Sequence, residues 1–310
     1  ARGKRIACHV IMAAVSGGTR LAGALLVLGS AFTAAAPSQA SVTEHRTYRP
    51  PVLVASNPRT YIIEHLFSQE ECNALVRRAE AHGMEVATIM SGDGTQKPTA
   101  GSRASFTAVL GGVEGNDLQL RTWRERMAAA ALLPVNHAEP LAIAHYRGGH
   151  GDRYELHFDS SLSVGRVATV LVFLSDVHHG GELMFPWARA ENVSALGLNG
   201  ITGPGRPISE LQGVNKEPPI LPMCLDPEDA ALKISPRAGR AVVFFSHTPD
   251  LRRASYRAMH AGCPPARLGE DKWLAQLFIK WHPIGQPNLV QRAMAVLNEE
   301  WRMPLLDDID

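Results

Sequence analysis

The chain has few cysteines, almost no net charge and no hydrophobic run of full membrane-spanning length, and each shortage excludes a class of protein. Its 310 residues include four cysteines, too few for the disulfide framework of a small secreted protein. A net charge of +1 gives no reason to expect a nucleic-acid partner. The remaining composition, 45% hydrophobic and 20% charged, is that of a globular protein with one sizeable core.

Acidic residues are absent before Glu44, whereas four basic residues occur there. Within this region, residues 21–36 form an apolar run of 16 residues, and a membrane-spanning helix needs ~20. The pattern predicts a signal peptide or a short signal anchor over residues 1–45. The chain would then enter the secretory pathway, in the membrane or lumen of the endoplasmic reticulum or Golgi. An organelle transit peptide is the alternative, because such peptides are also poor in acidic residues.

Two further features would suit an oxidising compartment. One disulfide among Cys72, Cys224 and Cys263 is possible there, although the sequence does not select the pair. Asn192, Val193 and Ser194 form a glycosylation sequon. Sequons are common by chance, so this one only agrees with the route that the N-terminal region predicts.

Two helices are predicted in the first half of the chain, which contains no internal repeat. Ser68 and Glu71 form a capping box, and apolar residues follow at helical spacing until Gly83. A second helix is predicted from Asp117 to Leu132, ahead of Pro134, with three large apolar residues on one face. Each pattern is typical of an amphipathic helix that packs on another element.

From Leu141 onward the pattern changes to that of strands. Three runs are apolar and rich in β-branched or aromatic residues, and each predicts a strand: 167–174, 241–245 and 273–281. The first run is apolar almost throughout, which indicates a strand buried on both faces. Residues 187–233 are rich in Gly, Pro and Asn without periodicity, and predict a mobile lid or substrate loop. Helices followed by many strands predict an α+β fold with a sheet sandwich. A final helix is expected over 287–301.

The triplet from His157 to Asp159 ends a strand-like segment and is the strongest candidate for a metal site. Residues two apart in a strand point to the same side, so His157 and Asp159 can direct an imidazole and a carboxylate at one point. With a second histidine from elsewhere, these groups form the facial triad of non-haem Fe(II) oxygenases. An isolated triplet of this kind would be weak support for a metal.

Ordered motifs on either side of the triplet make the signal specific. From about Pro58 through Trp281 the chain resembles the prolyl 4-hydroxylases, a branch of the 2-oxoglutarate-dependent Fe(II) dioxygenases. The blocks that carry this resemblance are residues 67–75, 101–107, 166–176, 180–186, 236–246, 259–264 and 271–273. The resemblance implies a double-stranded β-helix, or jelly roll, with supporting helices on one sheet. It places the catalytic domain at residues 46–285, followed by a helical tail at 286–310.

The resemblance also implies the residues of the site. The metal ligands would be His157, Asp159 and His260, and Lys272 would bind the far carboxylate of 2-oxoglutarate, with Tyr146 also touching this co-substrate. Lys272 lies two positions later than the family lysine, and Tyr146 two positions earlier than the family tyrosine. Both departures fall in loops, which tolerate insertions.

Four further residues match positions near the peptide substrate in the family: Tyr154, Arg166, Phe278 and Lys280. A solvated charge at the end of a strand is the alternative for Arg166. His178 and His179 are set aside as a metal pair because neighbouring side chains diverge. Other residues are expected in loops or on the surface (His145, His150 and His247) or in packing (Trp123 and Trp187).

The implied activity is hydroxylation of peptidyl proline at C4, coupled to oxidative decarboxylation of 2-oxoglutarate to succinate and CO2. It requires Fe(II), 2-oxoglutarate, O2 and ascorbate, and a proline-rich peptide or protein as the partner. Three alternatives remain: another peptidyl hydroxylase of the same class, a zinc hydrolase, or a non-catalytic peptide-binding module with a retained metal site. A hydrolase would have no use for Lys272 or Tyr146. The oligomeric state stays open.

Overall fold

The computed structural model describes residues 50–90, 96–98, 103–111, 117–160, 165–211, 218–247 and 255–284. The predictions for residues 1–45 and 286–310 lie outside these ranges. All described elements belong to one compact unit, residues 47–310. No helix in the described ranges is long and apolar enough to cross a membrane.

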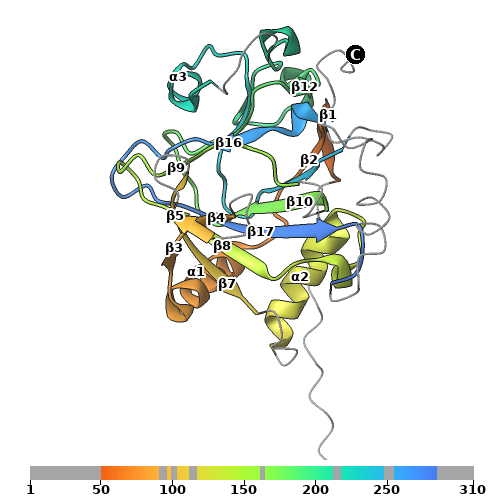
Figure 1. The fold of residues 1–310 in the computed structure, drawn as a ribbon, viewed down its shortest axis with the longest axis vertical. Coiled ribbons are helices and arrows are strands. Elements are labelled where there is room, and N and C mark those ends of the chain that lie inside the picture. The colour runs from red at the N-terminus through yellow and green to blue at the C-terminus, as the bar shows by residue number, and fades with distance from the viewer. Residues whose placement is uncertain are drawn as a thin grey trace, which may run out of the picture. The chain divides into compact units, whose positions relative to one another are not determined.

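Two antiparallel sheets form the core of the described part (Figure 1). The major sheet runs in the order β12 (Arg189–Ala190), β1 (Val52–Asn57), β2 (Arg59–Ile63), β15 (Ala241–Phe245), β10 (Arg166–Phe173), β17 (Lys272–Lys280), β8 (Leu141–Tyr146), β7 (Phe106–Leu110) and β3 (Glu85–Val86). The minor sheet runs β13 (Ile201–Thr202), β14 (Leu232–Ile234), β11 (Leu183–Phe185), β16 (His260–Gly262), β9 (Arg153–His157) and β6 (Arg103–Ala104). A separate hairpin joins β4 (Thr88–Met90) to β5 (Gln96–Pro98).

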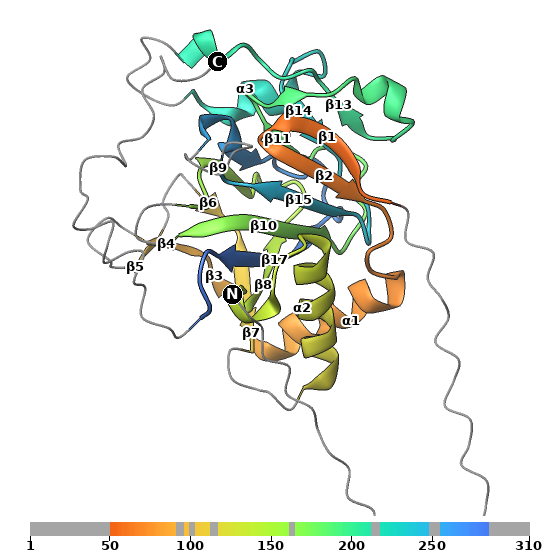
Figure 2. The ribbon, with the colours of Figure 1, turned by 90° about the vertical axis from the view of Figure 1, so that its right-hand side faces the viewer.

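Two helices cover one side of the major sheet, and the minor sheet lies on the other side (Figures 1 and 2). Helix α1 (Gln69–His82) begins at Ser68, whose side chain accepts the Glu71 N–H while the Glu71 carboxylate accepts the Ser68 N–H. This confirms the predicted capping box. Helix α2 (Leu118–Ala130) is capped by Asp117 and ends two residues before the predicted boundary. Trp123 is buried against the sheet, as expected of a packing residue.

The space between the two sheets forms a second core, which explains why β10 is apolar on both faces. Val170 and Val172 of β10 pack under the helices, whereas Leu171 and Phe173 point toward the minor sheet. Alternate residues of a strand face opposite sides, so a strand buried on both sides must be apolar throughout. The predicted jelly-roll fold with helices on one sheet is confirmed.

The minor sheet has a cover of its own, which the sequence did not predict. Helix α3 (Ile220–Leu225) packs on its outer face through Ile220 and Met223, and the disulfide Cys224–Cys263 ties the helix to the chain just after β16. The pair that the sequence left open is therefore Cys224 and Cys263, and Cys72 is a buried free thiol.

Residues 187–233, for which a mobile lid or substrate loop is predicted, contain more secondary structure than their lack of periodicity suggests. This segment contributes β12, β13 and the start of β14 to the sheets, and it contains α3. Short 3-10 turns at Val193–Leu196 and Ile208–Leu211 connect these elements. Strands of two or three residues are too short to show a periodic pattern, and they form here because neighbouring strands supply their hydrogen-bond partners. Residues 212–217 lie outside the described ranges.

Candidate active site

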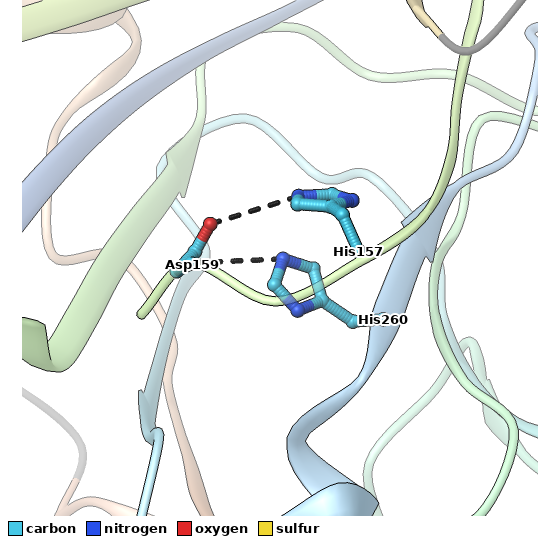
Figure 3. Close-up of side chains that lie close together, drawn as sticks. All are labelled: His157, Asp159 and His260. Atoms are coloured by element: carbon cyan, nitrogen blue, oxygen red, sulfur yellow. Dashed lines mark ion pairs between the residues drawn. The ribbon is translucent and has the colours of Figure 1, made fainter. Parts of the chain in front are cut away.

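The two strands that carry the predicted histidine ligands are neighbours in the minor sheet. His157 is the last residue of β9 and pairs directly with His260, the first residue of β16. Asp159 follows two residues after His157, where the chain has left the strand. Ligand atoms of all three side chains lie within 4.8 Å of one another. Figure 3 shows that the three side chains converge on one point.

Backbone carbonyls fix the orientation of both imidazole rings. His157 Nδ1 lies 2.8 Å from the Glu155 carbonyl oxygen, and His260 Nδ1 lies 3.0 Å from the Ala258 carbonyl oxygen. A carbonyl oxygen only accepts, so each Nδ1 carries the proton and each Nε2 keeps its lone pair. Each Nε2 is 3.6 Å from one carboxylate oxygen of Asp159. These are the free lone pairs that a metal ion requires.

The protonation states also suit a metal. Burial lowers the pKa of His260 to about 4, so its ring is neutral at physiological pH. Burial opposes ionisation of Asp159, but the nearby His260 and His157 outweigh it and hold the pKa of Asp159 below its usual range. The Thr169 hydroxyl donates to Asp159 Oδ2 at 2.6 Å. Two imidazole nitrogens directed at one point and one oriented carboxylate fit Fe(II), which prefers this donor set with adjacent coordination positions open.

A pocket leads from the two histidines to Lys272. Its polar lining is Tyr146, Tyr154, His157, His260, Lys272 and Gln276, its apolar lining is Leu171, Phe173, Leu183 and Leu274, and Gly262 completes it. Gly262 borders the Lys272 end of the pocket, since a Cβ there would lie in van der Waals contact with Lys272 Nζ at 3.4 Å. The pocket thus offers metal ligands at one place and a buried cation at another.

Lys272 is the first residue of β17 and is almost fully buried. Its Nζ donates to the Cys263 carbonyl oxygen at 2.8 Å and lies 4.2 Å from the centre of the Tyr146 ring. Burial lowers the pKa of Lys272 to about 7, and the negative charge of Glu182 opposes this shift. A carboxylate placed beside Nζ would gain a charge-assisted hydrogen bond and would favour the protonated amine.

The structure places the two tyrosines at the pocket rather than at separate sites. Tyr146 ends β8 opposite Lys272, which is the position predicted for contact with the co-substrate. Tyr154, expected beside the peptide, stacks on the His157 ring with 3.5 Å between ring centres. The guanidinium of Arg103 lies 4.7 Å from the centre of the Tyr154 ring. Tyr154 therefore packs against a metal-ligand candidate while also lining the pocket.

The three other predicted peptide residues form one cluster at the opposite end of β17. The Arg166 guanidinium lies 3.7 Å from the centre of the Phe278 ring and donates to both carboxylate oxygens of Glu139 at 2.9 and 2.7 Å. Lys280 Nζ is 3.5 Å from the same carboxylate. Arg166 also donates to the Asp159 carbonyl oxygen at 3.2 Å. Arg166 is thus no solvated strand-end charge, because it connects this cluster to the candidate metal ligand.

The histidines that were set aside lie away from the triad, but two of them are not surface residues. His145 lies on β8, stacked on Trp273 at 3.9 Å, with Nε2 2.7 Å from Asp271. His247 is buried beside Trp281. The expectation of a loop or surface position is wrong for His145, because a stacked ring and a carboxylate make partial burial of a histidine favourable. His247 follows β15 outside any strand or helix, as expected of a loop residue, but it is buried rather than on the surface.

Other expectations for excluded residues agree with the structure. His150 and His178 are exposed, and Glu270 accepts the backbone N–H groups of His178 and His179. Trp187 is buried in the core beneath α3.

Sequence reasoning missed Thr169 and Glu139, both of which hold site residues in place. Thr169 is the only polar residue within the otherwise apolar interior of β10, between Arg166 and Phe173. A lone hydroxyl in a strand buried on both faces needs a partner, and this signal could have predicted a role for Thr169. Glu139 gave no such signal, because its contact with Arg166 depends on the tertiary structure.

Comparison with known proteins agrees with this geometry. Residues 141–280, which include the triad and Lys272, match the model of the 2OG-Fe(II) oxygenase superfamily. This match and the triad identify the protein as a 2-oxoglutarate- and Fe(II)-dependent dioxygenase. When bound, Fe(II) supplies the oxygen chemistry, and His157, Asp159 and His260 would hold it.

The chain is also similar to plant prolyl 4-hydroxylases, which confirms the resemblance noted in the sequence. It is 29% identical over 236 residues to "Probable prolyl 4-hydroxylase 3" of Arabidopsis thaliana, covering 74% of this chain and 70% of the relative. It is 27% identical over 240 residues to "Prolyl 4-hydroxylase 5" of the same plant, covering 74% and 71%.

Among solved structures, a viral collagen prolyl hydroxylase from Paramecium Bursaria Chlorella virus-1, in its 2OG complex, is 19% identical with a TM-score of 0.42. That comparison covers 71% of this chain and 94% of the viral chain. A prolyl hydroxylase from Trichoplax adhaerens, in complex with a peptide fragment of hypoxia inducible factor, is 14% identical with a TM-score of 0.46. It covers 76% of this chain and 86% of that one.

Proposed function

We propose that the protein hydroxylates peptidyl proline at C4 and converts 2-oxoglutarate to succinate and CO2 in the same turnover. The observation that carries the proposal is a pocket lined by His157, His260 and a buried Lys272, with Asp159 beside the two histidines. This arrangement binds a metal at one end and an extended dicarboxylate between metal and cation. The curated relatives named prolyl 4-hydroxylases support the choice of proline as the target.

Co-substrate binding and peptide binding fall at opposite ends of β17. Lys272 holds the far carboxylate of 2-oxoglutarate, and Tyr146 packs beside it. At the other end of the strand, Arg166 and Phe278 form a stacked surface beside the Asp159 loop, where a proline ring can lie flat. Glu139 and Lys280 keep the edge of this surface charged and polar. The separation places the peptide next to the metal without overlap with the co-substrate.

A panel of peptides tests this proposal. Purified protein with Fe(II), 2-oxoglutarate and ascorbate is incubated with a collagen-like peptide, a cell-wall-glycoprotein-like peptide and a matched peptide with alanine in place of every proline. Succinate release should rise with at least one proline-rich peptide and stay at the basal level with the alanine peptide. A proline-rich peptide suits an extended groove because its polyproline II conformation is already stiff. Equal release with and without proline would contradict the proposal.

The same proposal includes the compartment of the enzyme and its requirement for ascorbate. The disulfide Cys224–Cys263 and the exposed Asn192 of the sequon support an oxidising secretory compartment. The apolar run at 21–36, outside the described residues, would deliver the chain there as a signal peptide or membrane anchor, and ascorbate would keep the iron reduced. Protection of the enzyme from protease in intact microsomes, lost on adding detergent, would support this location.

A further inference from the structure

Gln276 is a polar residue in the pocket for which the described structure shows no partner. Its side chain is 8% exposed and lines the pocket together with His157, His260 and Lys272. In the described part of the chain, no hydrogen bond or ion pair to its carboxamide is found, although such bonds are present for Lys272 and both histidines. A buried amide without a hydrogen bond is unfavourable, so the group is expected to meet a ligand.

The strand register shows which part of the pocket Gln276 faces. On β17, Lys272 and Gln276 share one face and lie four residues apart, or ~13 Å along the strand. Gln276 pairs with Leu171 of β10, and the next inward residue of β10 toward the triad is Thr169, which donates to Asp159. Gln276 therefore lies toward the metal end of the pocket, away from the Lys272 end.

At the metal end of the pocket, a carboxylate of the co-substrate would need a hydrogen-bond donor. Each histidine Nδ1 is already bonded to a backbone carbonyl, and each Nε2 faces the metal point. The Thr169 hydroxyl already donates its hydrogen bond to Asp159. Among the described polar residues that line the pocket on this side, Gln276 and Tyr154 have neutral donors without a hydrogen bond to the described chain, and Gln276 is the one that shares a strand face with Lys272. Amide N–H groups suit a carboxylate oxygen, and their bond to a charged acceptor is stronger than one between neutral groups.

We propose that Gln276 is a further co-substrate-binding residue, whose carboxamide donates a hydrogen bond to the C1 carboxylate of 2-oxoglutarate at the metal end of the pocket. Lys272 and Gln276 then hold opposite ends of one dicarboxylate from the same face of one strand. This contact rests on the 2-oxoglutarate-dependent class of the enzyme and is independent of which peptide is hydroxylated.

Equilibrium binding tests the assignment without relying on turnover. The affinity of Fe(II)-loaded protein for 2-oxoglutarate is measured by calorimetry under nitrogen for wild type and for Gln276→Met, which keeps the length of the side chain but removes the amide. We expect about tenfold weaker binding or more. Gln276→Glu should weaken it further, because it places like charges together. Gln69→Met on the exposed surface of α1 is the matched control, and its affinity should equal that of wild type.

A second ligand shows which end of the co-substrate is held. Levulinate retains the keto group and the far carboxylate of 2-oxoglutarate but has a methyl group in place of the C1 carboxylate. Gln276→Met should leave levulinate binding within twofold of wild type, whereas Lys272→Ala should weaken both ligands. Unchanged 2-oxoglutarate affinity in a Gln276→Met protein of wild-type melting temperature would overturn the assignment, as would equal losses for both ligands. If Lys272→Ala also left 2-oxoglutarate binding intact, the pocket itself would be wrongly assigned.

Discussion

At the scale of single residues, the site depends on groups that fix the ligands as well as on the ligands themselves. Carbonyl oxygens set the tautomer of His157 and His260, and the Thr169 hydroxyl orients the Asp159 carboxylate. Each of these contacts comes from the backbone or from a strand of the opposite sheet. The jelly roll therefore supplies the geometry, and the three side chains supply the donor atoms.

Thr169→Val tests this support. Valine has nearly the same shape, so packing inside β10 is kept, but Asp159 Oδ2 loses the donor that lies 2.6 Å away. Loss of such an outer contact reduces metal affinity by roughly 10- to 100-fold. Titration of the metal-free protein with Fe(II) under nitrogen should show this loss, with turnover restored at high iron. Asp159→Ala should abolish turnover at any iron concentration. Thr122→Val on the exposed face of α2 is the control, and an affinity equal to that control would contradict the role of Thr169.

Lys272 predicts a pH dependence of co-substrate binding. Its pKa in the empty pocket is about 7 because burial disfavours the charged amine. The carboxylate binds the protonated form, so affinity should be highest below pH 7. It should fall as pH rises above 7, toward roughly tenfold per pH unit.

Calorimetric titrations of 2-oxoglutarate at pH 6.5, 7.5 and 8.5 measure this dependence, and they should also show proton uptake on binding. Lys272→Arg provides the control, because a guanidinium stays charged throughout this range and should flatten the profile. The same affinity for wild type at all three pH values would show that Lys272 is already charged in the free pocket.

At the scale of elements, α3 and its disulfide hold the strand that carries His260 and the carbonyl that binds Lys272. The Cys263 carbonyl oxygen accepts a hydrogen bond from Lys272 Nζ, and the Cys263 side chain is joined to α3 by the disulfide with Cys224. At the other end of α3, the Ile220 N–H donates to Glu155 on β9 at 3.4 Å. The helix is thus fixed to both ligand-bearing strands of the minor sheet.

Removal of the disulfide should weaken both the fold and the co-substrate site. Cys224→Ala opens a bridge between residues 39 apart, which should lower the free energy of unfolding by roughly 2–4 kcal/mol. It should also weaken 2-oxoglutarate binding, because Cys263 is then less firmly placed against Lys272. Urea unfolding and calorimetry measure the two effects.

Cys72→Ala is the comparison for the disulfide variant. Burial raises the pKa of the Cys72 thiol to about 12, so this cysteine is unreactive and does not exchange with the disulfide. The substitution should cost stability through lost packing alone and leave 2-oxoglutarate affinity unchanged. If Cys224→Ala lost stability but bound 2-oxoglutarate like Cys72→Ala, the link from the disulfide to Lys272 would be wrong.

Elements with a strong local signal could be predicted from the sequence, and elements that depend on neighbours could not. The capping box at Ser68 and the apolar runs of β10 and β15 gave helix and strand positions within a few residues. The two-residue strands β12 and β13, and α3, carry no periodic pattern. They exist because the edges of the two sheets and the disulfide stabilise them.

For the site, the triad and Lys272 could be predicted because they occur in recognisable motifs. The structure brings His157, His260 and Lys272 into one pocket, despite the two-residue offset of Lys272, and places Asp159 beside the two histidines. Glu139 and Gln276 could not be predicted, because their significance comes from contacts between strands far apart in the sequence. Tyr154 shows the limit of motif matching, since its ring packs on His157 as well as lining the pocket.

At the scale of the whole molecule, each sheet carries site residues on its inner face and is stabilised by helices on its outer face. The major sheet is stabilised by α1 and α2 on its outer face, and its inner face carries Lys272, Gln276 and Thr169. The minor sheet supplies both histidines and is stabilised on its outer face by α3. The co-substrate pocket lies between the sheets, and the candidate peptide surface around Arg166 and Phe278 lies where β10 begins and β17 ends.

The central claim is that this pocket joins 2-oxoglutarate oxidation to hydroxylation of a peptidyl proline. The most direct measurement is turnover under 18O2 with Fe(II), 2-oxoglutarate and the best proline-rich peptide, followed by mass spectrometry of both products. A dioxygenase of this kind should place one labelled oxygen atom in succinate and one at C4 of proline, in equal amounts and only when all components are present. Labelled succinate without labelled hydroxyproline for any peptide, or a hydroxyl oxygen derived from water, would contradict the account.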